Sequence, residues 1–213
     1  MESKFWLDKW QANQIGFHEN LVHPMLSQHW DVIAHDTRGP VFVPLCGKSN
    51  DMTWLRERGH EVVGVELSEI AAQSFFAENH LEMQASESGK FRRYEGDGYT
   101  ILCADIFDIT REDLPAFSFV YDRAALIALP PPTRLRYISH LRGLCPVDTQ
   151  ILLVTLSYPE NAISPPPFEV PDQEIQEHFG QWCEVAQIGK GTADVKGVAG
   201  SETAYRLKVG QIG

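Results

Sequence analysis

Two short apolar runs, each followed by a helical pattern, constrain this chain more than any other feature. The runs cover residues 41–45 and 61–68, and helical patterns follow over residues 49–60 and 68–80. Strands that are buried on both faces are continuously apolar rather than alternating. Strand–helix–strand–helix order with short connections therefore predicts an α/β fold with a parallel sheet.

The rest of the chain continues this alternation. Strands are expected at residues 99–103, 117–122, 150–158, 182–190 and 203–210, and helices at residues 131–145 and 172–180. Gly96-Asp97-Gly98 lies between two strand-like runs, residues 90–95 and 99–103, and predicts a hairpin turn that joins them. The last two strands are expected to form an antiparallel edge pair. The proline-rich segment 159–171 has the length expected of a loop that covers a site.

The first 38 residues are predicted to form a helical cap. Trp6 and Trp10 are four residues apart and so lie on one helical face. Residues 23–34 carry apolar side chains at helical spacing, with Pro24 suited to the first turn. No repeat or low-complexity tract divides the chain. We therefore expect one domain over residues 1–213, with a cap at 1–38 and a core at 39–213.

Composition and charge disfavour several classes of function. The formal net charge is −11 at pH 7, which repels nucleic acid and anionic lipid. No apolar run approaches the roughly 20 residues needed to span a bilayer, and the N-terminus lacks the features of a signal peptide. The four cysteines are scattered, and no zinc-hydrolase histidine pair occurs. We expect a cytoplasmic monomer with no metal site, no nucleic-acid partner and no membrane partner.

The loop after the first strand imitates two nucleotide motifs and fits neither. Gly47-Lys48-Ser49 matches the end of a P-loop, but the required earlier glycine is replaced by Phe42. A dinucleotide fingerprint needs three glycines for close approach to a pyrophosphate, and only Gly47 is present. A P-loop is therefore rejected, and a dinucleotide is poorly served; a nicotinamide oxidoreductase stays open as a weaker alternative.

A nucleoside without phosphates remains compatible with this loop. It needs an acid for its ribose hydroxyls, and Glu66 closes the second strand 19 residues after Gly47. S-adenosylmethionine has ribose, adenine and a sulfonium cation that an acidic site tolerates. The alternative for Glu66 is a solvent-facing strand end. After the third strand, the pair Asp105-Ile106 is placed to bind adenine.

A third acidic position, Asp122, ends the fourth strand and is followed by Arg123, where a reacting group would lie over the sheet. Its alternative is a local ion pair that caps the next helix. The chain shows no convincing nucleophile with its base. Such a pair is not required if a methyl group passes from S-adenosylmethionine to an acceptor that is already nucleophilic. That reaction mainly needs the two reactants to be positioned and water to be excluded.

Four segments together resemble the thiopurine S-methyltransferases in their shorter bacterial form. They are LDKWQANQIGFHE, VFVPLCGKSNDMTWLRERGHEVVGVELS, ADIFDI and YDRAALIAL. The resemblance extends from about Trp6 to Tyr205. It implies a class I, Rossmann-like methyltransferase fold: a seven-stranded, mostly parallel sheet with an antiparallel final strand, helices on both faces and a helical N-terminal lid.

The resemblance also implies S-adenosylmethionine as cofactor and assigns roles to particular residues. By matching position, Trp10, Leu45, Glu66 and Arg123 would contact the cofactor, Asp105 and Ile106 would bind adenine, and Phe17 would lie near the acceptor. The loop adds Gly47 as a cofactor contact, and Arg123 with Asp122 are the catalytic candidates.

The implied acceptors are small aromatic or heterocyclic thiols, thiopurines among them, and selenium or tellurium compounds. The alternatives are methyl transfer to oxygen or nitrogen of another small molecule, and a non-catalytic domain that binds the cofactor as a signal.

Overall fold

The computed structural model describes residues 3–35 and 37–211. Contacts divide it into two compact units, each described here by itself. The first unit comprises Met1–Pro24 and Arg38–Phe117, and the second comprises Met25–Thr37 and Ser118–Gly213. The expected single domain with a cap over residues 1–38 stays a prediction.

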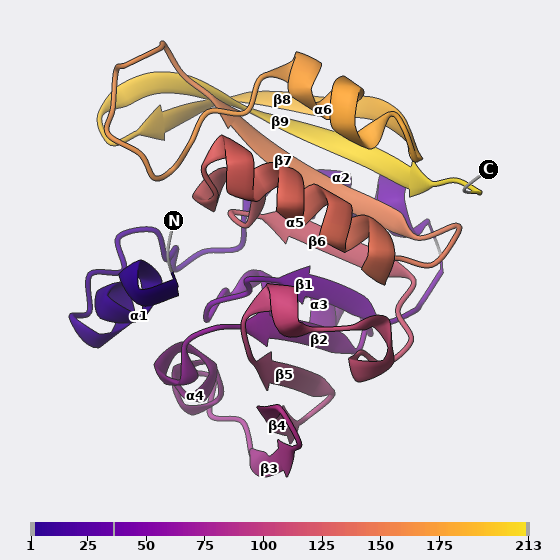
Figure 1. Cartoon of the computed structure of the whole chain (residues 1–213). Helices are drawn as coiled ribbons and strands as arrows, with labels where there is room; N and C mark the ends of the chain where they lie inside the picture. Colours follow the sequence, from indigo (N-terminus) through magenta and orange to yellow (C-terminus); the bar gives the residue numbers. More distant parts are fainter. Residues whose placement is uncertain (1–2, 36, 212–213) are drawn as a thin grey trace. The chain divides into compact units, whose positions relative to one another are not determined.

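The first unit contains the strand–helix–strand–helix pattern expected from the sequence (Figure 1). Its elements are α1 (Ser3–Gln11), β1 (Val41–Pro44), α3 (Asp51–Glu57), β2 (Val62–Glu66), α4 (Glu69–Glu78), β3 (Gln84–Ser88), β4 (Phe91–Gly96), β5 (Tyr99–Cys103) and the 3₁₀ turns η1 (Ile106–Asp108) and η2 (Arg111–Asp113). The strand order is β3-β4-β5-β2-β1. β1, β2 and β5 are parallel, so their carboxyl ends lie at one edge.

The apolar runs form the buried strands of this unit. Every residue of β1 and β2 is buried, as their continuous apolar sequences predict. Ser68 caps α4, since its hydroxyl accepts a hydrogen bond from the Ala71 amide at 3.3 Å, and Ser is a preferred N-cap residue that the sequence shows at the start of this helical pattern. Asn50 precedes α3 without a side-chain cap bond, and the Ser49 hydroxyl accepts from the Asp51 amide instead. These links fix where each helix begins at the carboxyl edge of the strands.

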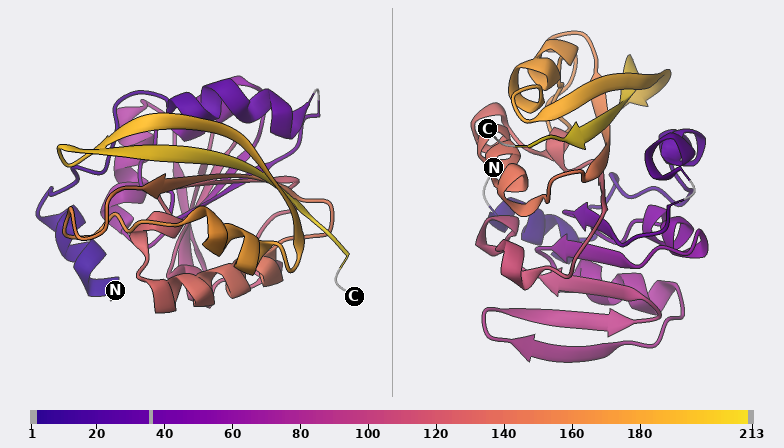
Figure 2. Two further views of the ribbon diagram at one scale, coloured as in Figure 1. Left: turned by 90° about the horizontal axis from the view of Figure 1, so that it is seen from above. Right: turned by 90° about the vertical axis from the view of Figure 1, so that its right-hand side faces the viewer.

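The expected number of seven strands is wrong, because the described residues contain nine. The antiparallel hairpin of β3 and β4 extends the edge beyond β5 (Figure 2). The turn at Gly96-Asp97-Gly98 and β4 were expected, but β3 was not. Residues 84–87 of β3 are all exposed and polar or small, so this strand carries no buried apolar pattern. It forms because β4 offers a partner, as in the cross-strand ion pair of Glu87 with Arg92.

The second unit contains the reversed final strand. Its elements are α2 (Pro24–Ala34), β6 (Phe119–Arg123), η3 (Leu126–Ala128), α5 (Pro131–Leu144), β7 (Gln150–Ser157), α6 (Asp172–Phe179), β8 (Cys183–Val195) and β9 (Val198–Val209). The strand order is β6-β7-β9-β8. β6 and β7 are parallel, whereas β9 is antiparallel to both of its neighbours, β7 and β8. The expected antiparallel edge pair is therefore confirmed, with longer strands than expected.

Helices cover both faces of these strands. Viewed from above, α2 lies on one side and α5 and α6 lie on the other (Figure 2). Trp30 of α2 packs on Phe119 of β6, with ring centroids 5.6 Å apart. On the opposite face, the buried Arg134 of α5 forms an ion pair with Glu174 of α6. Among the described residues, no helix is long and apolar enough to cross a membrane.

Candidate functional site

The loop after β1, residues 45–50, is named the cofactor loop after the role that the sequence predicts for it. Its backbone departs from ordinary conformations at Leu45, with φ of 47°, and at Gly47, with φ of 55°. Left-handed φ is costly for a leucine and persists only where the surroundings impose it. Hydrogen bonds to β2 impose this conformation here. The Cys46 amide donates to the Val65 carbonyl at 3.0 Å, and the Gly47 amide donates to the Glu66 carboxylate at 2.8 Å. The loop is therefore shaped by the neighbouring strand.

Cys46 fixes the depth at which the loop sits on β2. Its sulfur lies where a side chain on Gly64 would point, since a Cβ there would be 2.6 Å from Cys46 Sγ. Burial, and then the charge of Glu66, raise the pKa of the Cys46 thiol well above its ordinary value. A buried thiol held in its protonated form is a packing residue and a poor nucleophile.

Glu66 is the central polar group of the loop. Its two carboxylate oxygens accept the Gly47 amide at 2.8 Å and the Ser68 amide at 2.7 Å. The residue is only 6% exposed, so it is not a solvent-facing strand end. Burial raises the pKa of Glu66, while the hydrogen bonds from Ser68 and Gly47 act against that rise. The Leu67 amide acts in the same direction, and because a carboxylate has about four acceptor sites, capacity remains for a further donor.

An aromatic cluster of Trp6, Trp10 and Phe17 lies against the cofactor loop. Trp10 is 7% exposed, and its ring lies 3.4 Å from the position that a Cβ on Gly47 would take. Phe17 packs edge-on against both tryptophans, with centroid distances of 5.5 Å. Phe17 itself stays 40% exposed. The cluster thus joins Trp10 to Gly47 and leaves Phe17 with a free surface.

Asp105 and Ile106 follow β5 at the same carboxyl edge. Asp105 caps η1 by accepting the Phe107 amide at 3.1 Å, and its other oxygen accepts the Ser3 hydroxyl of α1 at 2.9 Å. Ile106 is buried. The Ala104 amide donates to the Glu66 carbonyl, which ties this turn to the end of β2. Both predicted adenine residues thus lie on the segment bonded to Glu66.

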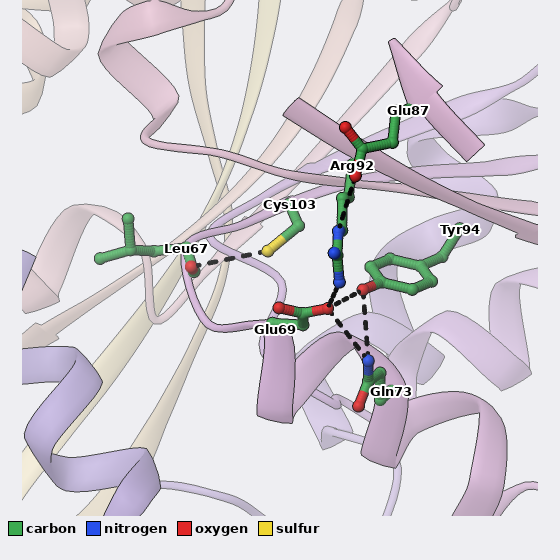
Figure 3. A network of polar contacts seen from close by, with 7 residues as sticks. All are labelled: Leu67, Glu69, Gln73, Glu87, Arg92, Tyr94 and Cys103. Carbon is green, nitrogen blue, oxygen red and sulfur yellow. Dashed lines mark hydrogen bonds and ion pairs between the residues drawn. The ribbon is translucent and has the colours of Figure 1, made fainter. Parts of the chain in front are cut away.

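A polar network supports the start of α4 next to Glu66. Glu69 accepts hydrogen bonds from Arg92 and, at 2.5 Å, from the Tyr94 hydroxyl (Figure 3). These bonds lower the pKa of Glu69, with the Tyr94 bond as the largest cause. Cys103 lies nearby, with its sulfur 3.7 Å from the Leu67 carbonyl. The network anchors the helix that carries the Ser68 amide used by Glu66.

In the second unit, Asp122 is fully buried at the end of β6. Its oxygens accept the Tyr137 hydroxyl of α5 at 2.6 Å and the Leu126 amide of η3 at 3.2 Å. Burial raises the pKa of Asp122 to about 6, and these two hydrogen bonds act against the rise. Arg123 is partly exposed and is followed by Ala124 at φ of 68°. Asp122 therefore shapes the turn that follows Arg123.

Several contributors to this geometry were not found in the sequence. The Ser3 hydroxyl donates to Asp105, and the Tyr137 hydroxyl donates to Asp122. Gly64 has no side chain, which leaves room for the Cys46 sulfur. Each partner is distant along the chain, and the residue types are common. Only Tyr137 carried a signal, since it lies on the apolar face of a predicted helix. The cofactor and catalytic roles of the named residues stay predictions.

Comparison with known proteins places the chain among methyltransferases by sequence. The family profile described as thiopurine S-methyltransferase matches residues 1–208. A thiopurine S-methyltransferase of Marinobacter nauticus is 44% identical over 190 residues, covering 89% of this chain and 87% of the relative. One from Pseudomonas fluorescens is 47% identical over 188 residues, covering 88% and 86%.

Solved structures agree on the fold. A SAM-dependent methyltransferase from Anabaena variabilis aligns with a TM-score of 0.68 at 13% identity, covering 97% of this chain and 94% of that one. The 1,6-didemethyltoxoflavin-N1-methyltransferase of Burkholderia thailandensis aligns with a TM-score of 0.66 at 13% identity, covering 97% and 87%. The chain therefore has the class I methyltransferase fold and belongs to the thiopurine S-methyltransferase family.

Proposed function

We propose that this protein is an S-adenosylmethionine-dependent S-methyltransferase that acts on small aromatic or heterocyclic thiols, thiopurines among them. Family membership over residues 1–208 gives the class of reaction. The observation that carries the site is the buried Glu66 carboxylate, bonded to the cofactor loop at the carboxyl edge of the strands. That edge is where open α/β sheets bind their ligands.

The polar groups of the loop suit a ligand with a ribose and no phosphate. The Gly47 amide, which a phosphate would need, already donates to Glu66. The Lys48 ammonium, which would pair with a phosphate, bonds Glu78 instead. Glu66 keeps acceptor capacity for the ribose hydroxyls. S-adenosylmethionine fits this set of donors and acceptors better than a nucleotide does.

The residues proposed to hold the cofactor follow the predicted set. They are Trp10, Leu45, Gly47, Glu66, Asp105, Ile106 and Arg123. Glu66 accepts from the ribose, Ile106 packs on the adenine, and Asp105 accepts from its amino group. Trp10 shields the cofactor loop from water, and Phe17 offers an exposed aromatic surface to the acceptor.

The bound cofactor supplies an electrophilic methyl group on a sulfonium. A thiolate acceptor is already a strong nucleophile, so the protein has to orient it and exclude water. Arg123 stabilises the anionic acceptor. Asp122 contributes by positioning Arg123, because its hydrogen bonds from Tyr137 and Leu126 fix the turn after Arg123. We thus propose Asp122 as a positioning residue and Arg123 as the group that meets the acceptor.

Methyl transfer to a panel of acceptors tests this function. Purified protein with S-adenosylmethionine is offered 6-mercaptopurine and thiophenol, with phenol and aniline as oxygen and nitrogen controls. Mass spectrometry should find one added methyl group on the thiols and none on the controls. Methylation of phenol or aniline but of neither thiol would show an O- or N-methyltransferase instead. Binding of S-adenosylmethionine without methyl transfer to any acceptor would show a non-catalytic cofactor-binding domain. Selenite and tellurite arms test the proposed wider acceptor range.

The role of Arg123 is tested by acceptor charge. Lysine cannot reproduce the planar fork of the guanidinium, so Arg123→Lys is expected to lower kcat/KM. If Arg123 stabilises an anionic acceptor, the loss is larger for a thiol that is ionised at pH 7.5 than for one still protonated. The same fold-loss for both thiols would leave Arg123 as a cofactor contact only.

We also propose that the protein works as a cytoplasmic monomer without nucleic-acid or membrane partners. Its net charge of −11 and the lack of a heptad pattern support this proposal. Light scattering at increasing protein concentration tests the oligomeric state.

A further inference from the structure

The cofactor loop contains a lysine that the proposed reaction does not use. Lys48 belongs to the Gly47-Lys48-Ser49 sequence that imitates a P-loop, yet its side chain does not serve a phosphate. Its ammonium bonds both carboxylate oxygens of Glu78, at 2.7 and 2.8 Å. The Lys48 side chain is only 11% exposed, whereas that of Glu78 is 54% exposed. A charge this shielded depends on its partner more than an exposed one does.

Glu78 is the last residue of α4, the helix whose first turn supports Glu66. At the start of α4, the Ser68 amide donates to Glu66 at 2.7 Å. At its end, Glu78 accepts from Lys48. The same helix therefore bonds to the acid at the end of β2 and to the loop that lies on β2. One short helix thus sets the positions of both polar parts of the proposed cofactor site.

The loop needs this external support because its own backbone does not favour its conformation. Leu45 and Gly47, on either side of Cys46, have positive φ values. Glycine adopts such values freely, but leucine does so only under constraint. The bonds of Cys46 and Gly47 to β2 hold this conformation on one side of the loop, and the Lys48–Glu78 pair holds it on the other. A loop released from Glu78 keeps only the bonds to β2, so the Gly47 amide is held less firmly against Glu66.

We propose that Lys48 is a positioning residue of the cofactor site. By pairing with Glu78 it holds the cofactor loop in the conformation that presents Leu45 and Gly47 to S-adenosylmethionine. Lys48 thus has a structural partner where a P-loop lysine has a phosphate. This inference rests on the proposed function, because it assigns a role within the same cofactor site.

Calorimetric titration with S-adenosylhomocysteine tests the pairing. Lys48→Met keeps the aliphatic stem and removes the charge, and Glu78→Gln removes the charge of the exposed partner with little risk to folding. Each single variant is expected to raise Kd about tenfold. The charge-swapped double variant Lys48→Glu/Glu78→Lys is expected to recover most of that loss, as coupled pairs do. At saturating cofactor, KM for the thiol acceptor stays at the wild-type value.

Lys208→Met provides the matched control. It breaks another lysine–carboxylate pair, Lys208 with Asp148 at 3.2 Å on β9, and is expected to leave Kd unchanged. Unchanged Kd in both single variants would overturn the inference. A loss in Lys48→Met alone, or no recovery in the swapped variant, would also overturn it, because Lys48 would then act on the cofactor directly. If the wild type binds no S-adenosylhomocysteine, the proposed function fails instead.

Discussion

Asp122→Asn is expected to change the pH dependence of stability in a defined direction. The Asp122 carboxyl is fully buried and bonded to Tyr137 and Leu126. Asparagine has nearly the same shape and keeps hydrogen-bonding groups on both sides, but it does not titrate. The variant therefore isolates the cost of holding a negative charge in this position.

The magnitude follows from the pKa of Asp122. Burial raises this pKa from its ordinary value of 3.8 to about 6 in the folded protein. The folded state therefore holds the proton more tightly than the unfolded state does, and wild-type stability falls as pH rises from about 4 to about 6. Each pKa unit corresponds to about 1.36 kcal/mol, so the full penalty above pH 6 is about 3 kcal/mol. Roughly 2 kcal/mol of it develops between about pH 4.5 and pH 7.5.

Urea unfolding at several pH values between 4.5 and 7.5 measures this effect. The free energy of unfolding of Asp122→Asn, minus that of the wild type, should rise with pH by about 2 kcal/mol. The exposed Asp108→Asn variant controls for the loss of a carboxylate as such and should show no comparable rise. A difference that stays flat for Asp122→Asn, or that falls with pH, would refute the assigned protonation behaviour.

Three further perturbations test the cofactor loop and the N-terminal segment. Gly64→Ala places a methyl group against Cys46 Sγ and should lower the stability measured by thermal unfolding by about 1–3 kcal/mol. Adding Cys46→Ala should restore part of this stability, and no restoration would show that the cost does not come from the contact with Cys46. Glu66→Ala should weaken S-adenosylhomocysteine binding by about 1.5–3 kcal/mol in calorimetry, and an unchanged Kd in a folded variant removes Glu66 from the site. Amide exchange over residues 8–20 should slow when S-adenosylhomocysteine binds, whereas equal rates would leave this segment purely structural.

The sequence by itself determined the alternation of buried strands and helices. Continuous apolar runs such as 41–45, the Ser68 cap and the turn at Gly96–Gly98 are local signals, and each appears in the structure as expected. The sequence also placed an acid, Glu66, at the end of a strand next to a loop too poor in glycine for phosphate. These features depend on neighbouring residues only, so a pattern along the chain is enough to find them.

Tertiary structure alone decided the pairings. β3 has no apolar pattern and becomes a strand because β4 lies beside it. Lys48 and Glu78 are 30 residues apart, and Asp122 and Tyr137 are 15 apart; the residue types at these positions have many possible partners. The depth of the cofactor loop depends on the missing side chain of Gly64. Such contacts arise only when distant segments pack, because each residue's choice of partner is set by the fold and not by its neighbours in the chain.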